Sequence, residues 1–168
     1  RRKSGRLIRK IEGEIEMEDL NTAVMQWGQE GFCCSQIMIL TGLALTGKEN
    51  KDLTAAMNGL CKGTFSPVCT CGALTGACCL LGFYAGKGAP LEDKDPRLPE
   101  MIGCLHEWFQ GKWGSGGHVN CGDILGFEPI ADPKQCFQKC FPMIMETLEK
   151  TLELLETHGF DIREGRPL

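Results

Sequence analysis

The apolar residues of this chain recur at the three- and four-residue spacing of amphipathic helices along most of its length. The last of these patterns is the clearest, because Asp132 and Pro133 supply an N-cap and a first-turn proline and Gly159 supplies a stop. The apolar stripe between them consists of Phe137, Cys140, Phe141, Ile144, Leu148, Leu152 and Leu155. Pro142 lies inside this stripe and predicts either a kink or a restart of the helix.

Five further segments share this spacing, and each ends at a glycine, a proline or a polar loop. They predict helices over 18–28, 33–45, 50–60, from about 71 onward, and 98–113. No segment alternates apolar and polar residues as a half-buried strand would, and no internal repeat is visible. The sequence therefore predicts an all-α fold, a single-domain helical bundle of about five to six helices.

Charge separates the beginning of the chain from the rest. The first ten residues carry six positive charges, whereas the whole chain of 168 residues has a net charge of -4. We expect residues 1–16 to be a basic leader that is disordered or not native to the protein, and residues 17–168 to form a helical, cysteine-rich redox domain. The acidic balance argues against nucleic-acid binding. The longest mostly apolar run, 72–85, is too short and glycine-rich for membrane insertion.

The unusual feature of the composition is sulfur. The chain has eleven cysteines, an odd number that cannot pair completely within one molecule. The N-terminal residues also lack the apolar stretch of a secretory signal. We therefore expect a cytoplasmic protein, where clustered thiols indicate metal or redox chemistry more often than structural disulfides.

The cysteine spacing predicts a site assembled by the fold. No tandem CxxC pair occurs, which excludes zinc ribbons and thioredoxin-type sites. Cys71 comes where a loop turns into an apolar helix, so free backbone N–H groups there favour its thiolate. The glycines that follow, Gly72 and Gly76, allow either close approach of the backbone to a cluster or a tight helix crossing. Cys121 is predicted on a flexible loop, where a cysteine packs poorly and a functional role is favoured.

The remaining cysteines have simpler interpretations. Cys34 and Cys140 lie on predicted buried faces, where a lone cysteine is usually a small hydrophobic residue. The cysteines expected in the core are Cys61, Cys78, Cys79 and Cys104. Those that could act as a resolving thiol are Cys33, Cys69 and Cys136. His118 could complete a metal site with Cys121, but a surface position is favoured for all three histidines.

Four pieces of sequence share a wider cysteine pattern, namely GFCCSQ at 31–36, CGALTG at 71–76, VNCGDILG at 119–126 and KC at 139–140. Through them the chain resembles, over residues 17–159, the redox-active proteins named for their C-GCAxxG-C-C cysteine signature. The resemblance implies that the signature cysteines are Cys34, Cys71, Cys121 and Cys140; Cys33 could replace the first and Cys136 the last. A similar module occurs in the split-Soret cytochromes of anaerobic bacteria, with which an iron-sulfur cluster has been associated.

The leading hypothesis is an electron-transfer protein that binds an iron-sulfur cluster of the [2Fe-2S] type. Its metal ligands would be Cys34, Cys71, Cys121 and Cys140, and iron rather than zinc is implied by the resemblance, because thiolates suit both. No catalytic residue is expected, so the protein would be an electron carrier or redox sensor rather than an enzyme. Its redox partner protein is unknown, and a homodimer is an open alternative.

Two rival hypotheses use the same sulfur atoms differently. The first is a thiol/disulfide redox protein without metal, using Cys69 and Cys71 or the adjacent cysteine pairs. The second is an interaction protein in which the four signature cysteines hold a structural Zn2+.

Overall fold

The structure, a computed structural model, describes residues 17–126 and 133–166. The expected basic leader at 1–16 and the expected N-cap Asp132 lie outside the described residues. The helices are α1 (Met17–Gln29), α2 (Cys34–Leu45), α3 (Lys51–Met57), the 3₁₀ turn η1 (Asn58–Leu60), α4 (Cys61–Thr64), α5 (Gly72–Ala85), α6 (Leu98–Trp113), α7 (Cys121–Leu125) and α8 (Pro133–Thr157). The described residues contain two isolated β-bridges and no strand, which confirms the all-α prediction.

The helix count slightly exceeds the expected five to six for local reasons. The segment that starts at Cys121, where the sequence predicted a loop, forms the short helix α7. The predicted helix over 50–60 is divided into α3, which Asn50 caps by accepting a hydrogen bond from the Leu53 amide at 2.9 Å, and η1. The segment labelled α4 is a turn whose residues Lys62 and Gly63 have left-handed backbone angles rather than helical ones.

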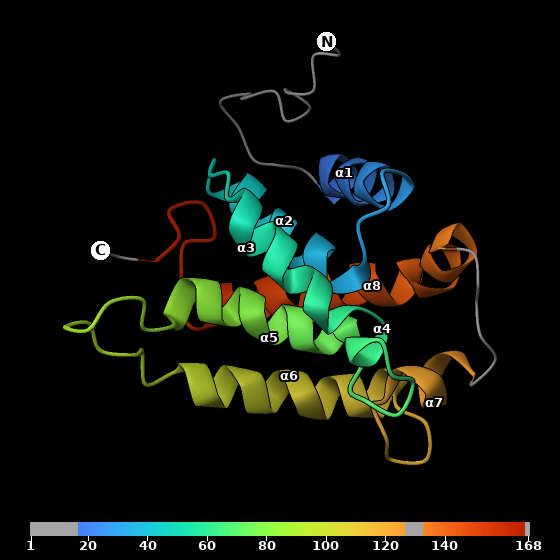
Figure 1. Cartoon of the computed structure of the whole chain (residues 1–168). Coiled ribbons are helices and arrows are strands. Elements are labelled where there is room, and N and C mark those ends of the chain that lie inside the picture. Colours follow the sequence, from blue (N-terminus) through green and yellow to red (C-terminus); the bar gives the residue numbers. More distant parts are fainter. Residues whose placement is uncertain (1–16, 127–132, 167–168) are drawn as a thin grey trace, which may run out of the picture.

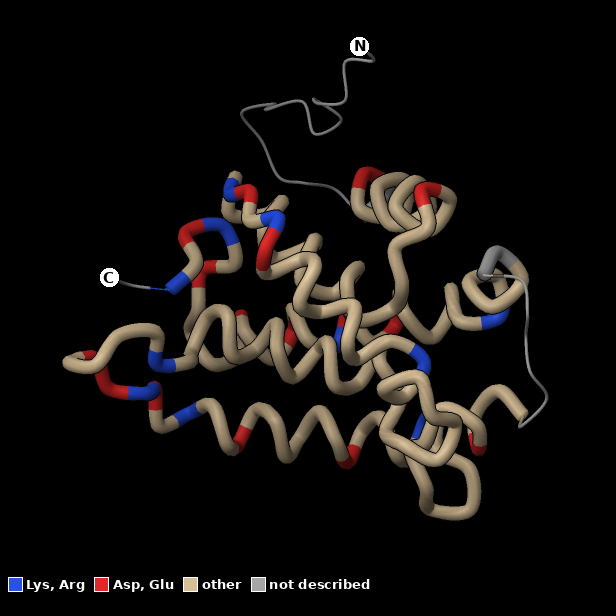
Figure 2. The backbone as a smooth tube through the Cα atoms, viewed as in Figure 1, with Lys and Arg blue, Asp and Glu red and all other residues tan. Residues whose placement is uncertain are grey.

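The helices α2 and α5 lie side by side at the centre of the molecule (Figure 1). α6 and α8 pack against α5, and α1 lies across α2 and α8. Both central helices lack charged residues, and Figure 2 shows α5 without Lys, Arg, Asp or Glu along its length. A helix that is apolar on all sides can be stable in water only when its neighbours cover it, which explains their central position.

The core follows from this arrangement. Its largest fully buried side chains include Ile37 and Met38 of α2, Leu74 and Leu80 of α5, and Phe109 of α6. The stripe predicted for the last helix is confirmed in α8, where Ile144, Leu148 and Leu155 are completely buried, and Pro142 lies inside one continuous helix. In the part of the chain that the structure describes, no helix is both long and apolar enough to cross a membrane.

Candidate functional site

The crossing of α2 and α5 brings Cys34 close to Cys71. A Cβ atom built on Gly72 would lie 2.7 Å from the Cys34 sulfur and 2.7 Å from the Leu60 carbonyl oxygen. A Cβ atom built on Gly76 would lie 2.7 Å from the Ser35 Cα. The sequence left open whether these glycines serve a helix crossing or a sulfur site; Gly76 makes room for the backbone of α2, and Gly72 makes room for a thiol.

Backbone hydrogen bonds bring Cys121 to the same region. The Cys71 amide donates to the Val119 carbonyl at 2.8 Å, and the Cys121 amide donates to the Cys69 carbonyl at 2.9 Å. This bridge joins the loop before α5 to the start of α7. Cys121 was expected on a flexible loop, but it is buried at the first position of α7, and that expectation is wrong because the bridge fixes the segment.

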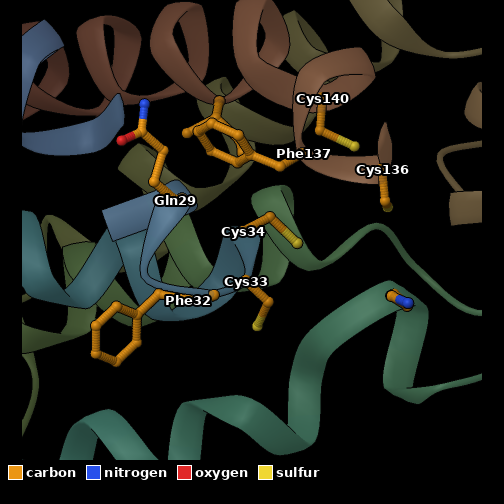
Figure 3. Close-up of a pocket in the computed structure, with 11 residues that line it drawn as sticks. Gln29, Phe32, Cys33, Cys34, Cys136, Phe137 and Cys140 are labelled. Atoms are coloured by element: carbon orange, nitrogen blue, oxygen red, sulfur yellow. The ribbon is translucent and has the colours of Figure 1, made fainter. Parts of the chain in front are cut away.

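The fourth signature cysteine comes from α8, one turn after a fifth thiol. The Cys140 thiol is hydrogen-bonded to the sulfur of Cys136. Both thiols line a cavity of about 230 Å³ together with Cys33, Cys34 and Lys62. In Figure 3 the two cysteines at the start of α2 lie on one side of this cavity, and Cys136 and Cys140 come from α8. The sequence named Cys136 as a substitute for Cys140, and the structure brings both to the cavity.

The thiols are close enough to affect one another's ionisation. Negative charge on one raises the pKa of another for Cys34 with Cys121 and Cys136, for Cys71 with Cys34 and Cys121, and for Cys140 with Cys136, Cys34 and Cys71. The four signature cysteines and Cys136 therefore form one cluster, which we call the thiol cluster. It is assembled from α2, α7 and α8 and from Cys71, the residue that precedes α5.

Burial is the largest influence on the pKa values of Cys34 and Cys71. It raises the pKa of Cys34 to about 11 and that of Cys71 to about 12. Backbone amides oppose this effect, with Ser35 and Lys62 donating to the Cys34 sulfur and Ala73 and Leu74 donating to the Cys71 sulfur. The amides expected at Cys71 are therefore present and favour its thiolate as predicted, but desolvation outweighs them and the net pKa of Cys71 is raised.

The pKa values of the two cysteines on α8, Cys136 and Cys140, are shifted in opposite directions. The hydrogen bond from the Cys140 thiol lowers the pKa of Cys136, and the positive charges of Lys62 and Lys139 lower it further. The same hydrogen bond, followed by burial, raises the pKa of Cys140. Because Cys136 is the member that ionises first, the thiol cluster holds its negative charge beside Lys62 at the cavity wall.

The donor chemistry of the thiol cluster suits a thiolate-bound metal centre. Four cysteine sulfurs are the ligand set of iron-sulfur clusters and of one class of structural zinc site, and the thiol cluster supplies four with one to spare. The amides that point at Cys34 and Cys71 are the N–H donors that stabilise metal-bound sulfur. Among the described residues, however, no group of three or more His, Cys, Asp or Glu side chains is arranged to hold a metal ion, so binding would require the sulfur atoms to draw together.

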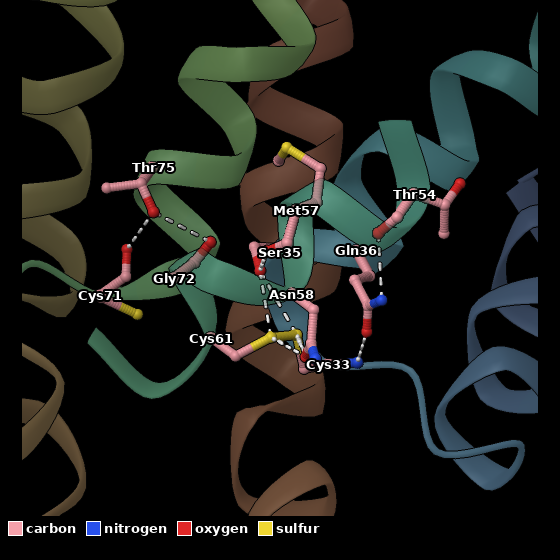
Figure 4. Close-up of a disulfide and its surroundings, with 10 residues drawn as sticks. All are labelled: Cys33, Ser35, Gln36, Thr54, Met57, Asn58, Cys61, Cys71, Gly72 and Thr75. Atoms are coloured by element: carbon pink, nitrogen blue, oxygen red, sulfur yellow. Dashed lines mark hydrogen bonds between the residues drawn. A yellow bond between two sulfur atoms is a disulfide. The ribbon is translucent and has the colours of Figure 1, made fainter. Parts of the chain in front are cut away.

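Two further cysteines are joined in a pair that the sequence did not predict. Cys33 and Cys61 form a disulfide, with Cα atoms 6.0 Å apart (Figure 4). Cys61 was expected in the core, and it is buried, but it is bonded as well. Cys69 and Cys71, named as a thiol-exchange pair, both carry free thiols.

The prediction of a core position is wrong for Cys79 and Cys104, which are exposed. α5 is apolar on nearly all sides, so its periodicity does not distinguish the exposed face that carries Cys79. In α6 the buried residues are Met101, Leu105 and Phe109, and Cys104 falls outside this set. His106 and His118 are exposed, as the favoured surface interpretation requires. His158 is half-buried, and its ring lies 2.7 Å from the Leu154 carbonyl oxygen.

The fold and the site together define an all-α protein whose thiols, from elements far apart in the sequence, gather at one end of a central helix pair. The chain belongs to the family described as "Putative redox-active protein (C_GCAxxG_C_C)", whose model matches residues 32–154. This confirms the resemblance that the cysteine motifs indicated. Neither a curated protein nor a solved structure matches the chain significantly.

Proposed function

We propose that this member of a redox-active family transfers electrons through an iron-sulfur cluster of the [2Fe-2S] type. The ligands would be Cys34, Cys71, Cys121 and Cys140. The observation that supports this proposal is that separate elements of the fold bring the four cysteines to one region. The Cys34 sulfur lies against Gly72 next to Cys71, backbone hydrogen bonds tie Cys121 to the loop before α5, and Cys34 and Cys140 line the same cavity. Deprotonating several buried thiols that lie close together is unfavourable unless a positive charge is present, and a bound metal centre would supply that charge.

The chain's own groups would hold the cluster and adjust it. Bound iron changes oxidation state one electron at a time, which is the chemistry that the cluster would supply. The amides of Ser35, Lys62, Ala73 and Leu74 would hydrogen-bond the ligand sulfurs and stabilise their negative charge. The surrounding core would keep water away and so affect the potential. Electrons would be exchanged with a separate redox partner protein.

The choice among neighbouring cysteines follows from their contacts. Cys33 is bonded to Cys61, so Cys34 is favoured as the ligand from the start of α2. Cys136 is hydrogen-bonded to Cys140 one turn away and remains the alternative ligand from α8. A comparison of the iron bound by Cys136→Ser and by Cys140→Ser would decide which of the two is the ligand from α8.

The test is purification of the full chain under anaerobic conditions, followed by iron, sulfide and zinc analysis. The proposal predicts a coloured protein with equal amounts of iron and acid-labile sulfide, whose visible absorbance falls on reduction with dithionite. Cys34→Ser and Cys71→Ser should lose most of the bound iron, because each removes a ligand. Cys79→Ser is the matched control, since this exposed thiol lies on α5 outside the thiol cluster.

The proposal would be wrong if the purified chain carried zinc in place of iron, or no metal after reconstitution with iron and sulfide. It would also be wrong if Cys34→Ser and Cys71→Ser retained as much iron as Cys79→Ser. Zinc bound at the same cysteines would support the structural-metal alternative.

A further inference from the structure

The Cys33–Cys61 disulfide lies at the edge of the thiol cluster and is reachable from one side only. It joins the residue before α2 to the turn that follows η1. Cys61 is 2% exposed, whereas Cys33 is half-buried and lines the 230 Å³ cavity. A reagent entering the cavity would therefore meet Cys33 and not Cys61.

The surroundings of this bond contain a hydrogen-bond acceptor for each sulfur in its reduced form (Figure 4). The Ser35 hydroxyl donates to the Met57 carbonyl at 2.8 Å, which leaves its oxygen free to accept, and this oxygen lies 3.3 Å from the Cys33 sulfur. The Asn58 side-chain oxygen lies 3.2 Å from the Cys61 sulfur. A disulfide has no proton to donate, so these acceptors can be used only when both cysteines are thiols.

This environment is unlike that of an inert structural disulfide. Contacts that stabilise the dithiol form make a disulfide easier to reduce, and such bonds are the labile or regulatory ones. Ser35 is buried and Asn58 is exposed, and they come from α2 and η1, the two helical segments next to the bonded cysteines. The pair is therefore well suited to change its oxidation state while the surrounding fold is kept.

The bond also holds the two segments that orient Cys34. Cys33 directly precedes Cys34, and Cys61 directly precedes Lys62, whose amide donates to the Cys34 sulfur. Lys62, Thr64 and Phe65 have positive φ angles of 51°, 55° and 58°. Left-handed backbone angles are unfavourable for non-glycine residues, so this turn needs outside support, which the bond to Cys33 provides.

We propose that Cys33 and Cys61 form a reversible dithiol–disulfide couple, distinct from the thiol cluster, that exchanges with an external dithiol and controls the access to Cys34. In the reducing direction, a thiolate of the dithiol attacks the Cys33 sulfur, the bond to Cys61 breaks, and Cys61 leaves and takes up a proton. The second thiol of the reductant then attacks the reductant sulfur that is bonded to Cys33, and Cys33 is released as a thiol. Two electrons and two protons pass from the dithiol to the protein, and the reductant ends as a disulfide. The existence of the couple is independent of the proposed cluster, and only its control over a cluster ligand rests on the proposed function.

The direct test is a redox titration of the metal-free full chain. The protein is equilibrated with mixtures of reduced and oxidised dithiothreitol, its free thiols are trapped by rapid alkylation, and each cysteine is scored by mass spectrometry. We expect Cys33 and Cys61 to gain and lose their alkyl groups together, reversibly and without denaturant. A pair that reacts only after unfolding, or that never forms while the exposed Cys79 and Cys104 are oxidised, would overturn the proposal.

A variant of the acceptor tests the reason for the reactivity. Asn58→Ala removes an exposed side chain whose oxygen can accept from the reduced Cys61. Because thiols are weak donors, we expect the equilibrium constant for reduction to fall by about two- to fivefold. Asn21→Ala, an exposed asparagine on α1, is the matched control and should leave this constant unchanged. An equal shift in both variants would contradict the role of the acceptor.

The coupling to Cys34 has its own measurement, the rate at which an alkylating reagent modifies Cys34 in the oxidised and in the reduced protein. Reduction frees the left-handed turn, so we expect this rate to rise by at least about threefold. Cys61→Ser, which cannot form the bond, should react at the reduced rate in either buffer. Identical Cys34 rates in the two oxidation states would exclude control over Cys34.

The two proposals fail separately. If the chain binds no iron but Cys33 and Cys61 react reversibly, only the iron-sulfur proposal is contradicted. If it binds iron while Cys33 and Cys61 do not react, only the dithiol–disulfide proposal is contradicted.

Discussion

The packing of α2 on α5 makes a sharp prediction for a single methyl group at Gly76. Gly76→Ala would place a Cβ atom 2.7 Å from the Ser35 Cα and 3.1 Å from the Ser35 carbonyl oxygen. Both are backbone atoms, which cannot rotate away as a side chain can. To restore an ordinary contact of 3.4 Å, α2 would have to move away by about 0.7 Å along the crossing.

The expected magnitude follows from two opposing effects. Overpacking of a close-packed core costs about 1–3 kcal/mol, and contact with backbone favours the upper half of that range. Replacing a mid-helix glycine with alanine raises the free energy of unfolding by about 1 kcal/mol, because alanine has the higher helix propensity. Gly76→Ala should therefore lower the free energy of unfolding by about 1–2 kcal/mol.

Gly82→Ala in the same helix isolates the packing effect. A Cβ atom at Gly82 has nothing within 4 Å, so this variant should gain stability by about 0.5–1 kcal/mol. Urea unfolding followed by circular dichroism, with all proteins in the same reducing buffer, gives both values. In thermal unfolding of the same proteins, the two Tm values should differ by about 3–12 °C. If Gly76→Ala were as stable as Gly82→Ala, the close packing of the α2 backbone on Gly76 would be refuted.

Three further predictions concern the contacts that fix the ends of the helices. Tyr84→Phe removes the hydroxyl that donates to the Ile162 carbonyl at 2.6 Å while keeping the buried ring, and should lower the free energy of urea unfolding by about 1–2 kcal/mol. Asn50→Ala removes the cap of α3 and should cost about 1 kcal/mol in the same assay; no change would contradict the capping role. The hydrogen bonds from Arg97 lower the pKa of Asp95 to about 2, so its contribution is complete above about pH 4 and is lost as the pH falls toward 2. The Tm difference between wild type and Asp95→Asn should therefore shrink over that range, and a constant difference would contradict the ion pair.

The helices could be predicted because their signals are local. The stripe of α8, the cap at Asn50 and the glycines that follow each helix can be recognised within a few residues. The exposed face of α5 could not be predicted as well, because Cys79 lies in a helix without charged residues and has apolar neighbours on both sides in sequence. A helix that is apolar all round leaves its exposed side undetermined until its neighbours are known.

The candidate site was predictable in its members but not in its geometry. The family motif named Cys34, Cys71, Cys121 and Cys140, and nothing in their spacing shows that they come together. The pairing of Cys33 with Cys61 had no sequence signal, because it depends on the left-handed turn at 62–65. Lysine, threonine and phenylalanine rarely adopt that backbone conformation, so no local propensity predicts it.

The wide spacing of the thiol cluster along the chain has a consequence for how a metal centre could be acquired. Cys34 and Cys140 are separated by more than half of the sequence, and the other two signature cysteines lie between them. In an unfolded chain these sulfurs would rarely meet, because closing such long loops is entropically unfavourable. Loading would thus follow folding, and a bound centre would act afterwards as a cross-link that ties the first half of the molecule to the last helix.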